Sequence, residues 1–297
     1  MRVAFIGLGN MGGGMAANQA KAGREVMAFD LSPAAMDKAV AAGCSRAGSV
    51  AEAVKSADAV ITMLPAGPHV RSVYAEHILP HAARTALLLD CSTIDVESAR
   101  AVAAQAKAAG FRFADAPVSG GTAAADAGTL AFMVGCDEAD FTGIEEALQP
   151  MSRATMRAGD HGAGQAAKIC NNMVLGISMI GVCEAFALAE KLGLEGERFF
   201  EIASKSSGQC WSLTSYCPFP GPVPAAPSNR NYEGGFATAM MLKDLKLAQD
   251  AAAKAGAATP LGGAAEGLYA LFDRLGGGGK DFSAILEMLR GNAPPSS

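Results

Sequence analysis

In the first half of the chain, short apolar runs alternate with longer alanine-rich stretches of helical character. The runs are continuously hydrophobic, which is typical of parallel strands that helices cover on both faces. We therefore predict an α/β domain with a doubly wound parallel sheet. Its six predicted strands are Val3–Ile6, Val26–Phe29, Ala59–Leu64, Ala86–Leu89, Phe111–Ala114 and Leu130–Val134.

The pattern changes near residue 160, where one long segment without proline runs from Gln165 to Lys191. Its uninterrupted apolar stretch, Met173–Cys183, is too short for a bilayer, which needs about 20 residues. We expect a buried helix that joins two domains and contributes to a subunit interface. The rest reads as helical, except that the prolines of Cys217–Pro227 require an extended loop. The predicted organisation is an α/β domain at 1–162, a connecting helix at 163–192 and an all-helical domain at 193–297.

Composition narrows the class of protein. Half of the 297 residues are hydrophobic and 18% are charged, so the chain can bury a substantial core. The net charge of −5 and the lack of a basic stripe argue against a nucleic-acid partner. The seven cysteines form no C-x-x-C pair and indicate reduced, mostly buried thiols. A first strand that begins at Arg2 leaves no room for a signal or transit peptide, so we expect a soluble cytoplasmic enzyme without a membrane segment, unless a leader was already removed.

A glycine motif, G-x-G-x-x-G, lies between the first predicted strand and the following helix. The first glycine permits a tight turn, the second lets the backbone approach a pyrophosphate, and the third allows close helix packing. The helix N-terminus offers free N–H groups to the phosphates. These features predict a Rossmann-type dinucleotide site formed by Gly7, Leu8, Gly9, Asn10, Met11 and Gly12.

Asp30 indicates which dinucleotide binds. It lies about 20 residues after Gly9, the spacing at which a carboxylate accepts hydrogen bonds from the adenosine ribose. No arginine follows in Leu31–Pro33 to neutralise a 2′-phosphate. We therefore predict NAD as cofactor rather than NADP. The alternative role, a cap for the next helix, suits Ser32 better.

A nicotinamide oxidoreductase also needs a group that takes the hydroxyl proton of its substrate. The sequence has no His/Cys cluster at metal spacing, so we expect no metal, and it has no Tyr-x-x-x-Lys pair. Lys168 is the strongest candidate, four residues before Asn172 on the same helix face. Its apolar neighbours would desolvate it in part and make it usable as a base. From composition alone, a surface lysine at a helix start is an equally good interpretation.

Four ordered motifs resemble those of the β-hydroxyacid dehydrogenases. They are Phe5–Gly12, Asp115–Gly121, Gly162–Asn172 and Lys243–Leu245. Looser segments, Gly208–Ser212, Asn231–Phe236 and Asp281–Ser283, are most similar to the branch that acts on 3-hydroxyisobutyrate. The resemblance implies NAD-dependent oxidation of a small 3-hydroxyacid, namely 3-hydroxyisobutyrate to methylmalonate semialdehyde in valine catabolism, by a homodimer or homotetramer. Tartronate or succinic semialdehyde reduction stays open as an alternative, as does a non-catalytic NAD-binding module.

The resemblance also implies residue roles. Lys168 would be the general acid/base and Asn172 would orient the substrate. The implied substrate-binding residues are Ser119, Gly120, Gly121, Asn172 and Lys243, and the further cofactor-binding residues are Leu64, Pro65, Thr93, Lys243 and Asp244. Two positions depart from the family pattern, Gly14 where proline is common and Gln19 where leucine is common. We expect Gly14 to loosen its helix by up to about 1 kcal/mol relative to alanine.

Overall fold

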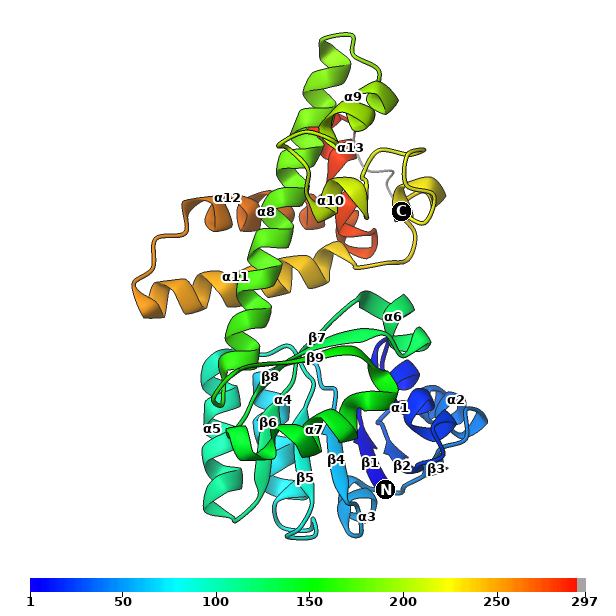
Figure 1. Ribbon diagram of the computed structural model, residues 1–297, viewed down its shortest axis with the longest axis vertical. Coiled ribbons are helices and arrows are strands. Elements are labelled where there is room, and N and C mark those ends of the chain that lie inside the picture. The colour runs from blue at the N-terminus through cyan, green and yellow to red at the C-terminus, as the bar shows by residue number, and fades with distance from the viewer. Residues whose placement is uncertain (293–297) are drawn as a thin grey trace. The chain divides into compact units, whose positions relative to one another are not determined.

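The computed structural model describes residues 1–292, which divide into two compact units, Met1–Lys168 and the described chain from Ile169 onward (Figure 1). The first unit contains one sheet in the order β3-β2-β1-β4-β5-β6-β8-β7, with β9 paired to β8. Its strands are β1 (Arg2–Ile6), β2 (Glu25–Phe29), β3 (Ser45–Arg46), β4 (Ala59–Thr62), β5 (Leu87–Asp90), β6 (Arg112–Asp115), β7 (Val118–Ser119), β8 (Leu130–Gly135) and β9 (Ser152–Gly159).

The predicted doubly wound parallel sheet is confirmed for β1 to β6, which pair in parallel. The predicted strand at Leu130–Val134 is present as β8, but it runs antiparallel to β6 and β7. Three further strands, β3, β7 and β9, were not predicted. The first two span two residues each, and β9 alternates between exposed and half-buried positions at the edge of the sheet.

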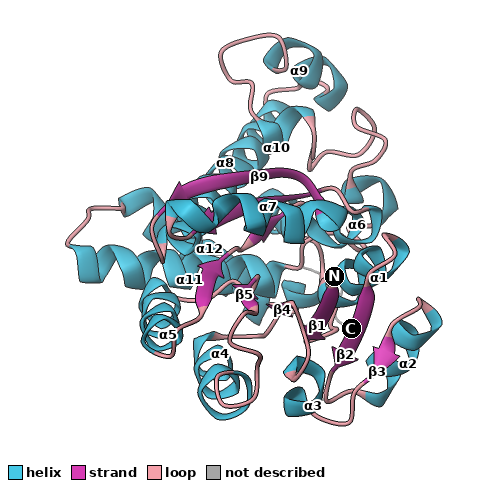
Figure 2. Cartoon of the chain, turned by 60° about the horizontal axis from the view of Figure 1, so that its bottom comes forward, coloured by secondary structure: helices cyan, strands magenta, loops and turns pink. Residues whose placement is uncertain are grey.

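Helices cover both faces of this sheet (Figure 2). In β1, Val3 and Phe5 join the apolar cluster under α1, α2 and α7, whereas Ala4 and Ile6 join the cluster under α3, α4 and α5. Burial on both faces explains the continuous hydrophobicity of these strands. The helices are α1 (Gly12–Lys21), α2 (Pro33–Ala41), α3 (Val50–Val54), α4 (Gly67–Val73) with a π-turn at Tyr74–Ile78, α5 (Val96–Ala108), α6 (Gly121–Ala127) and α7 (Phe141–Leu148), with 3₁₀ turns at Glu138–Asp140 and Gln149–Met151.

The second unit is helical and has its own core. Its elements are the greater part of α8 (Ala163–Lys191), then α9 (Gly196–Ala203), α10 (Trp211–Thr214), α11 (Thr238–Ala255), α12 (Pro260–Arg274) and α13 (Ile285–Arg290), with 3₁₀ turns at Pro227–Arg230, Gly277–Gly279 and Phe282–Ala284. The helix predicted from Gln165 is confirmed and begins two residues earlier. The proline-rich loop is also confirmed, since no helix or strand occurs between Cys217 and Ala226.

The helix α8 is the core helix of the second unit. Met179, Cys183 and Phe186 have no exposed surface and lie in its apolar cluster. At Gly176, an added Cβ would lie 3.1 Å from Leu245 Cδ2 of α11. By length and composition alone, α8 would also pass as a membrane span, but core helices of soluble proteins pass the same test.

The two departures from the family pattern have structural partners. A Cβ on Gly14 would lie 2.4 Å from Asp126 Oδ1 and 3.0 Å from both the carbonyl carbon of Ala125 and the backbone nitrogen of Asp126, so the backbone of α6 packs directly against α1 at this point. Gln19 is completely buried. Its Nε2 donates to Ala147 O at 2.9 Å, and its Oε1 accepts from Arg24 Nη1 at 2.8 Å. Both polar atoms of the buried amide therefore have hydrogen-bond partners.

Candidate active site

The glycine motif forms a tight turn between β1 and α1. Gly7 has φ +93°, and a Cβ there would lie 2.3 Å from Met63 O. A Cβ on Gly12 would lie 2.0 Å from Gly7 O, so neither position accepts a side chain. No atom lies within 4 Å of a Cβ built on Gly9, so its backbone is open to a phosphate. This cradle fits the pyrophosphate of a dinucleotide.

Asp30 follows β2 and contacts the glycine turn. Its Oδ2 accepts the N–H of Leu8 at 2.6 Å, and its Oδ1 accepts the N–H of Ser32 at 2.7 Å. The carboxylate is only half-buried and keeps lone pairs for ribose hydroxyls. Ser32 Oγ accepts the N–H of Ala35, so the cap of α2 is Ser32, as predicted.

The loops after β4 and β5 lie at the same carboxyl edge of the sheet, because these strands are parallel neighbours. Leu64 and Pro65 follow β4, and Thr93 follows β5. The N–H of Leu64 donates to Ser92 Oγ at 2.8 Å, which joins the two loops. Ligands of open α/β sheets bind at this edge.

The Ser119–Gly121 turn joins β7 to α6. Gly120 has φ +137° and Gly121 has φ +70°, conformations that favour glycine. A Cβ on Gly120 would lie 2.6 Å from Ala124 Cβ, whereas nothing lies within 4 Å of a Cβ built on Gly121. The main chain at Gly121 is thus accessible to a small anion.

Lys168 and Asn172 lie one turn apart on the same face of α8, and their exposed fractions are 7% and 2%. Burial of Lys168 excludes the interpretation as a surface lysine. A buried lysine is rare unless it is partnered or functional.

In the second unit, the structure brings Asn172 together with Asp244 of α11. Asn172 Nδ2 donates to Asp244 Oδ2 at 2.5 Å. Lys243 Nζ lies 3.8 Å from Asp244 Oδ1, and the Asp244 side chain is buried. The Lys243–Asp244 pair is therefore not an exposed helix ion pair of little energy.

A buried polar network that the sequence did not single out joins α8 to the sheet. Asp115, at the end of β6, accepts the N–H of Gly162 at 2.7 Å and the N–H of Gln165 at 2.9 Å. Gln165 Nε2 donates to Ser92 O at 2.7 Å. Burial raises the pKa of the Asp115 carboxyl, although these backbone N–H groups oppose the shift. The only sequence signal was that Asp115 and Gln165 lie inside the family motifs.

Asp90, at the end of β5, belongs to the same region. Its Oδ1 accepts the hydroxyls of Thr62 at 2.7 Å and Ser92 at 2.6 Å. Complete burial raises the pKa of Asp90 to about 6, and the hydrogen bonds from Ser92 and Thr62 limit the rise. Its Oδ2 accepts no hydrogen bond from the part of the chain that the structure describes.

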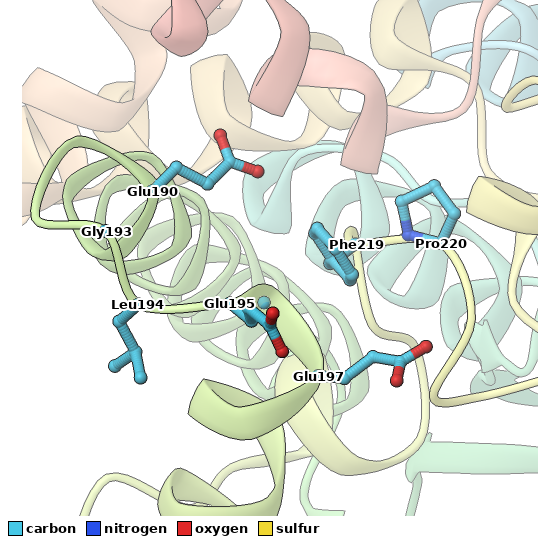
Figure 3. A pocket seen from close by; sticks show the side chains of 8 residues that line it. Glu190, Gly193, Leu194, Glu195, Glu197, Phe219 and Pro220 are labelled. Carbon is cyan, nitrogen blue, oxygen red and sulfur yellow. The ribbon is translucent and has the colours of Figure 1, made fainter.

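One surface hollow of about 570 Å³ lies at the end of α8 and contains none of the predicted site residues (Figure 3). Glu190, Glu195, Glu197 and Phe219 line it. Arg290 pairs with Glu190 and lies over the Phe219 ring at 5.6 Å. The ion pair and the contact with the ring account for the presence of Glu190 and Phe219 in the lining of the hollow.

Two family models match this chain. The NAD-binding domain of 6-phosphogluconate dehydrogenase matches residues 2–159, and the NAD-binding region of NADP-dependent 3-hydroxyisobutyrate dehydrogenase matches residues 162–289. The chain belongs to the 3-hydroxyisobutyrate dehydrogenase family, since a member of it is 48% identical over 97% of this chain. It is an oxidoreductase that acts on a CH–OH group with NAD as its cofactor. Within residues 1–292, no group of three His, Cys, Asp or Glu side chains could hold a metal ion.

Relatives in the 3-hydroxyisobutyrate dehydrogenase family match the full chain. A 3-hydroxyisobutyrate dehydrogenase of Pseudomonas aeruginosa is 48% identical over 97% of this chain and 98% of its own length. An NAD-dependent L-serine dehydrogenase of the same organism is 47% identical over 97% of both chains. The solved structure of Mycobacterium tuberculosis 3-hydroxyisobutyrate dehydrogenase with L-serine is 48% identical, with a TM-score of 0.94 over 97% of this chain and 99% of that one.

Proposed function

We propose that this enzyme oxidises 3-hydroxyisobutyrate to methylmalonate semialdehyde with NAD, as in valine catabolism, and that Lys168 is its general acid/base. The observation that carries the proposal is the buried pair Lys168 and Asn172 on one face of α8. A lysine amine and an amide buried one turn apart suit a substrate whose hydroxyl must lose a proton.

In this proposal, each residue of the candidate site has a separate role. Lys168 Nζ, in its neutral form, accepts the hydroxyl proton as the carbon loses hydride, and returns it in the reverse direction. Bound NAD supplies the hydride acceptor. Asn172 is held by Asp244 and orients the substrate beside Lys168. The open Ser119–Gly121 turn binds the substrate carboxylate through its hydroxyl and backbone N–H groups, because no Cβ blocks the approach at Gly121.

The cofactor contacts follow the geometry of the first unit. We propose that the Gly7–Gly12 turn binds the pyrophosphate and that Asp30 binds the adenosine ribose. Leu64, Pro65 and Thr93 line the path toward the nicotinamide at the carboxyl edge of the sheet. From the second unit, we propose that Lys243 and Asp244 contact the cofactor, with Lys243 also contacting the substrate.

L-Serine is a second candidate substrate, which the L-serine dehydrogenase relative and the L-serine-bound structure support. L-Serine and 3-hydroxyisobutyrate share a carboxylate and a CH₂OH group on one carbon. They differ in an ammonium or a methyl group at that carbon. Comparison of kcat/KM for the two compounds at fixed NAD decides between them, and tartronate and succinic semialdehydes complete the panel in the reverse direction.

We also propose a domain organisation, an oligomeric state and a cellular location. Residues 1–162 bind the dinucleotide, residues 163–192 form the connecting helix, and residues 193–297 form the helical domain. The assembly is a homodimer or homotetramer, which the exposed apolar side chains of α8 support. The seven free cysteines support a cytoplasmic location.

Replacing Lys168 with Met tests the proposed chemistry. General acid–base catalysis contributes about 10²- to 10⁴-fold, so kcat is expected to fall by that factor while the Kd for NAD stays unchanged. NADH formation gives kcat, and titration calorimetry gives Kd. Lys191→Met, at the exposed end of the same helix, is the control and keeps full turnover. Comparable turnover in Lys168→Met would remove the lysine from the mechanism.

A further inference from the structure

We propose that Gln165 is a positioning residue that fixes the Ser92–Ile94 loop to the turn of α8 that carries Lys168. The proposal rests on the proposed role of Lys168. Gln165 then sets the location of the base relative to the loop that contains Thr93, without contacting the reacting atoms itself.

The side chain of Gln165 bridges both sides of this loop. Its Nε2 donates to Ser92 O at 2.7 Å, and its Oε1 accepts the N–H of Ile94 at 3.1 Å. The residue is completely buried. Each polar atom of the amide therefore has a main-chain partner on either side of Thr93, and rotation of the amide would leave buried groups unpaired.

The helical side of the bridge is equally restrained. Asp115 accepts the N–H groups of Gly162 and Gln165 and so satisfies two free donors at the start of α8. A Cβ on Gly164 would lie 2.4 Å from Met133 O and 2.6 Å from Asp115 O. This first turn thus lies directly against the ends of β6 and β8. Lys168 follows Gln165 by three residues on the same helix, so its Cα position is set with it.

The loop side is anchored through hydroxyl groups. Ser92 Oγ donates to Asp90 Oδ1 at 2.6 Å while it accepts the N–H of Leu64 at 2.8 Å. Thr62 Oγ1 donates to the same Asp90 oxygen. The ends of β4 and β5 are therefore tied together, and Gln165 is the side chain that joins them to α8.

This arrangement predicts a specific kinetic effect. In our proposal the glycine turn and Asp30 bind the adenosine end, and within residues 1–292 neither forms a hydrogen bond with Gln165. Loss of the bridge is therefore expected to shift the base more than it weakens cofactor binding. A misplacement of about 1 Å can cost about 10²-fold in rate. A purely structural role would instead lower stability, kcat and cofactor affinity together.

The test is Gln165→Met, which keeps the volume and removes both hydrogen bonds. We expect kcat with 3-hydroxyisobutyrate to fall by about 10²-fold, with a Kd for NAD close to that of the wild type. In the protein without cofactor, the Ile94 amide is expected to exchange hydrogen roughly fivefold faster, because it loses its acceptor. Gln105→Met, on the exposed face of α5, is the matched control and changes none of these values.

Unchanged kcat together with faster Ile94 exchange would overturn the proposal, as would a parallel fall of kcat, Kd and melting temperature. If Gln165→Met does not fold, Gln165→Glu carries the comparison of kcat with the Kd for NAD, since it loses the donor to Ser92; because it keeps the acceptor for Ile94, exchange at that amide is expected to stay unchanged. Failure of the proposed function has a different signature: Lys168→Met would retain turnover, whereas the exchange result at Ile94 would be unaffected. That outcome also removes the basis for a positioning role.

Discussion

The carboxylate of Asp30 is bonded to the backbone of Leu8 and Ser32, so it cannot swing away from an incoming 2′-phosphate. Asp30→Asn removes the charge and keeps an oxygen for the Leu8 N–H. A like-charge contact costs about 1 kcal/mol or more, so the Kd for NADP is expected to tighten by about tenfold while NAD binding weakens. Calorimetric titration with both cofactors checks this. Asp37→Asn, an exposed carboxylate on α2, is the control; unaltered selectivity in Asp30→Asn would refute the role of Asp30.

Asp90 makes stability depend on pH. Its folded-state pKa of about 6 lies above the ordinary value of 3.8, so the folded protein holds this proton more tightly than the unfolded chain. The contribution of this proton to the free energy of unfolding is fully present below the ordinary pKa and is lost as the pH rises to about 6. At roughly 1.4 kcal/mol per pKa unit, its loss amounts to about 3 kcal/mol.

Asp90→Asn removes this titration. As the pH rises from about 4.5 to about 7.5, the free energy of unfolding of the variant is expected to increase by up to about 2 kcal/mol relative to that of the wild type. Urea unfolding at the two pH values measures the difference. Because only the pH-dependent change is compared, the fixed effect of the amide cancels. A constant difference between variant and wild type would show that Asp90 does not titrate in this range.

Site residues were predictable where a local motif carries the chemistry. The glycine turn, Asp30 and the Lys168–Asn172 spacing are all short-range patterns in the sequence. The polar network was not predictable, because Gln165 bonds to Ser92 across 73 residues and to Asp115 across 50. Such partners are fixed only when strands and helix pack together. The burial of Lys168 argues against one of the two interpretations that composition left equal, the surface lysine, and its role in catalysis stays a prediction.

At the level of elements, the start of α8 depends on the absence of one side chain. Gly164 lies against Met133 O and Asp115 O, so Gly164→Ala forces the first turn away from the strand ends. Overpacking of this kind costs about 1–3 kcal/mol. Urea unfolding is expected to show that loss.

The matched control for this substitution is Gly267→Ala in α12, where no atom lies within 4 Å of the added Cβ. Alanine is the better helix former, so stability is expected to rise by up to about 1 kcal/mol. Equal effects of the two alanines would contradict a steric cause at Gly164.

Strands were predicted where burial on both faces makes them continuously apolar, as in β1, β4 and β5. The elements β3 and β7 span two residues and leave no periodic signal. In β9, Arg153 and Arg157 interrupt the apolar pattern, because this strand lies at the edge and has one face in solvent. The antiparallel direction of β8, which pairs with β6 and β7, is not encoded in its composition.

At the scale of the whole molecule, each unit buries its own apolar clusters, but α8 keeps large apolar side chains on its surface. Val174 is 63% exposed and Leu188 is 59% exposed. Sedimentation velocity is expected to give two or four times the mass of one chain. Val174→Glu with Leu188→Glu should shift the distribution toward the monomer, because charge in a buried interface is costly. The control is Leu31→Glu, at an exposed site in the first unit, which should leave the distribution unchanged. A monomeric wild type would contradict the proposed assembly.

The continuity of α8 has one further consequence. Lys168 is the last residue of the first unit and Asn172 belongs to the second. Both lie on α8, where the four residues between their positions correspond to a rise of about 6 Å along the helix axis. The backbone hydrogen bonds of α8 fix the spacing between Lys168, the proposed general acid/base, and Asn172. Whatever rearrangement admits a reactant or frees a product, this spacing is inherited from the helix and needs no realignment between turnovers.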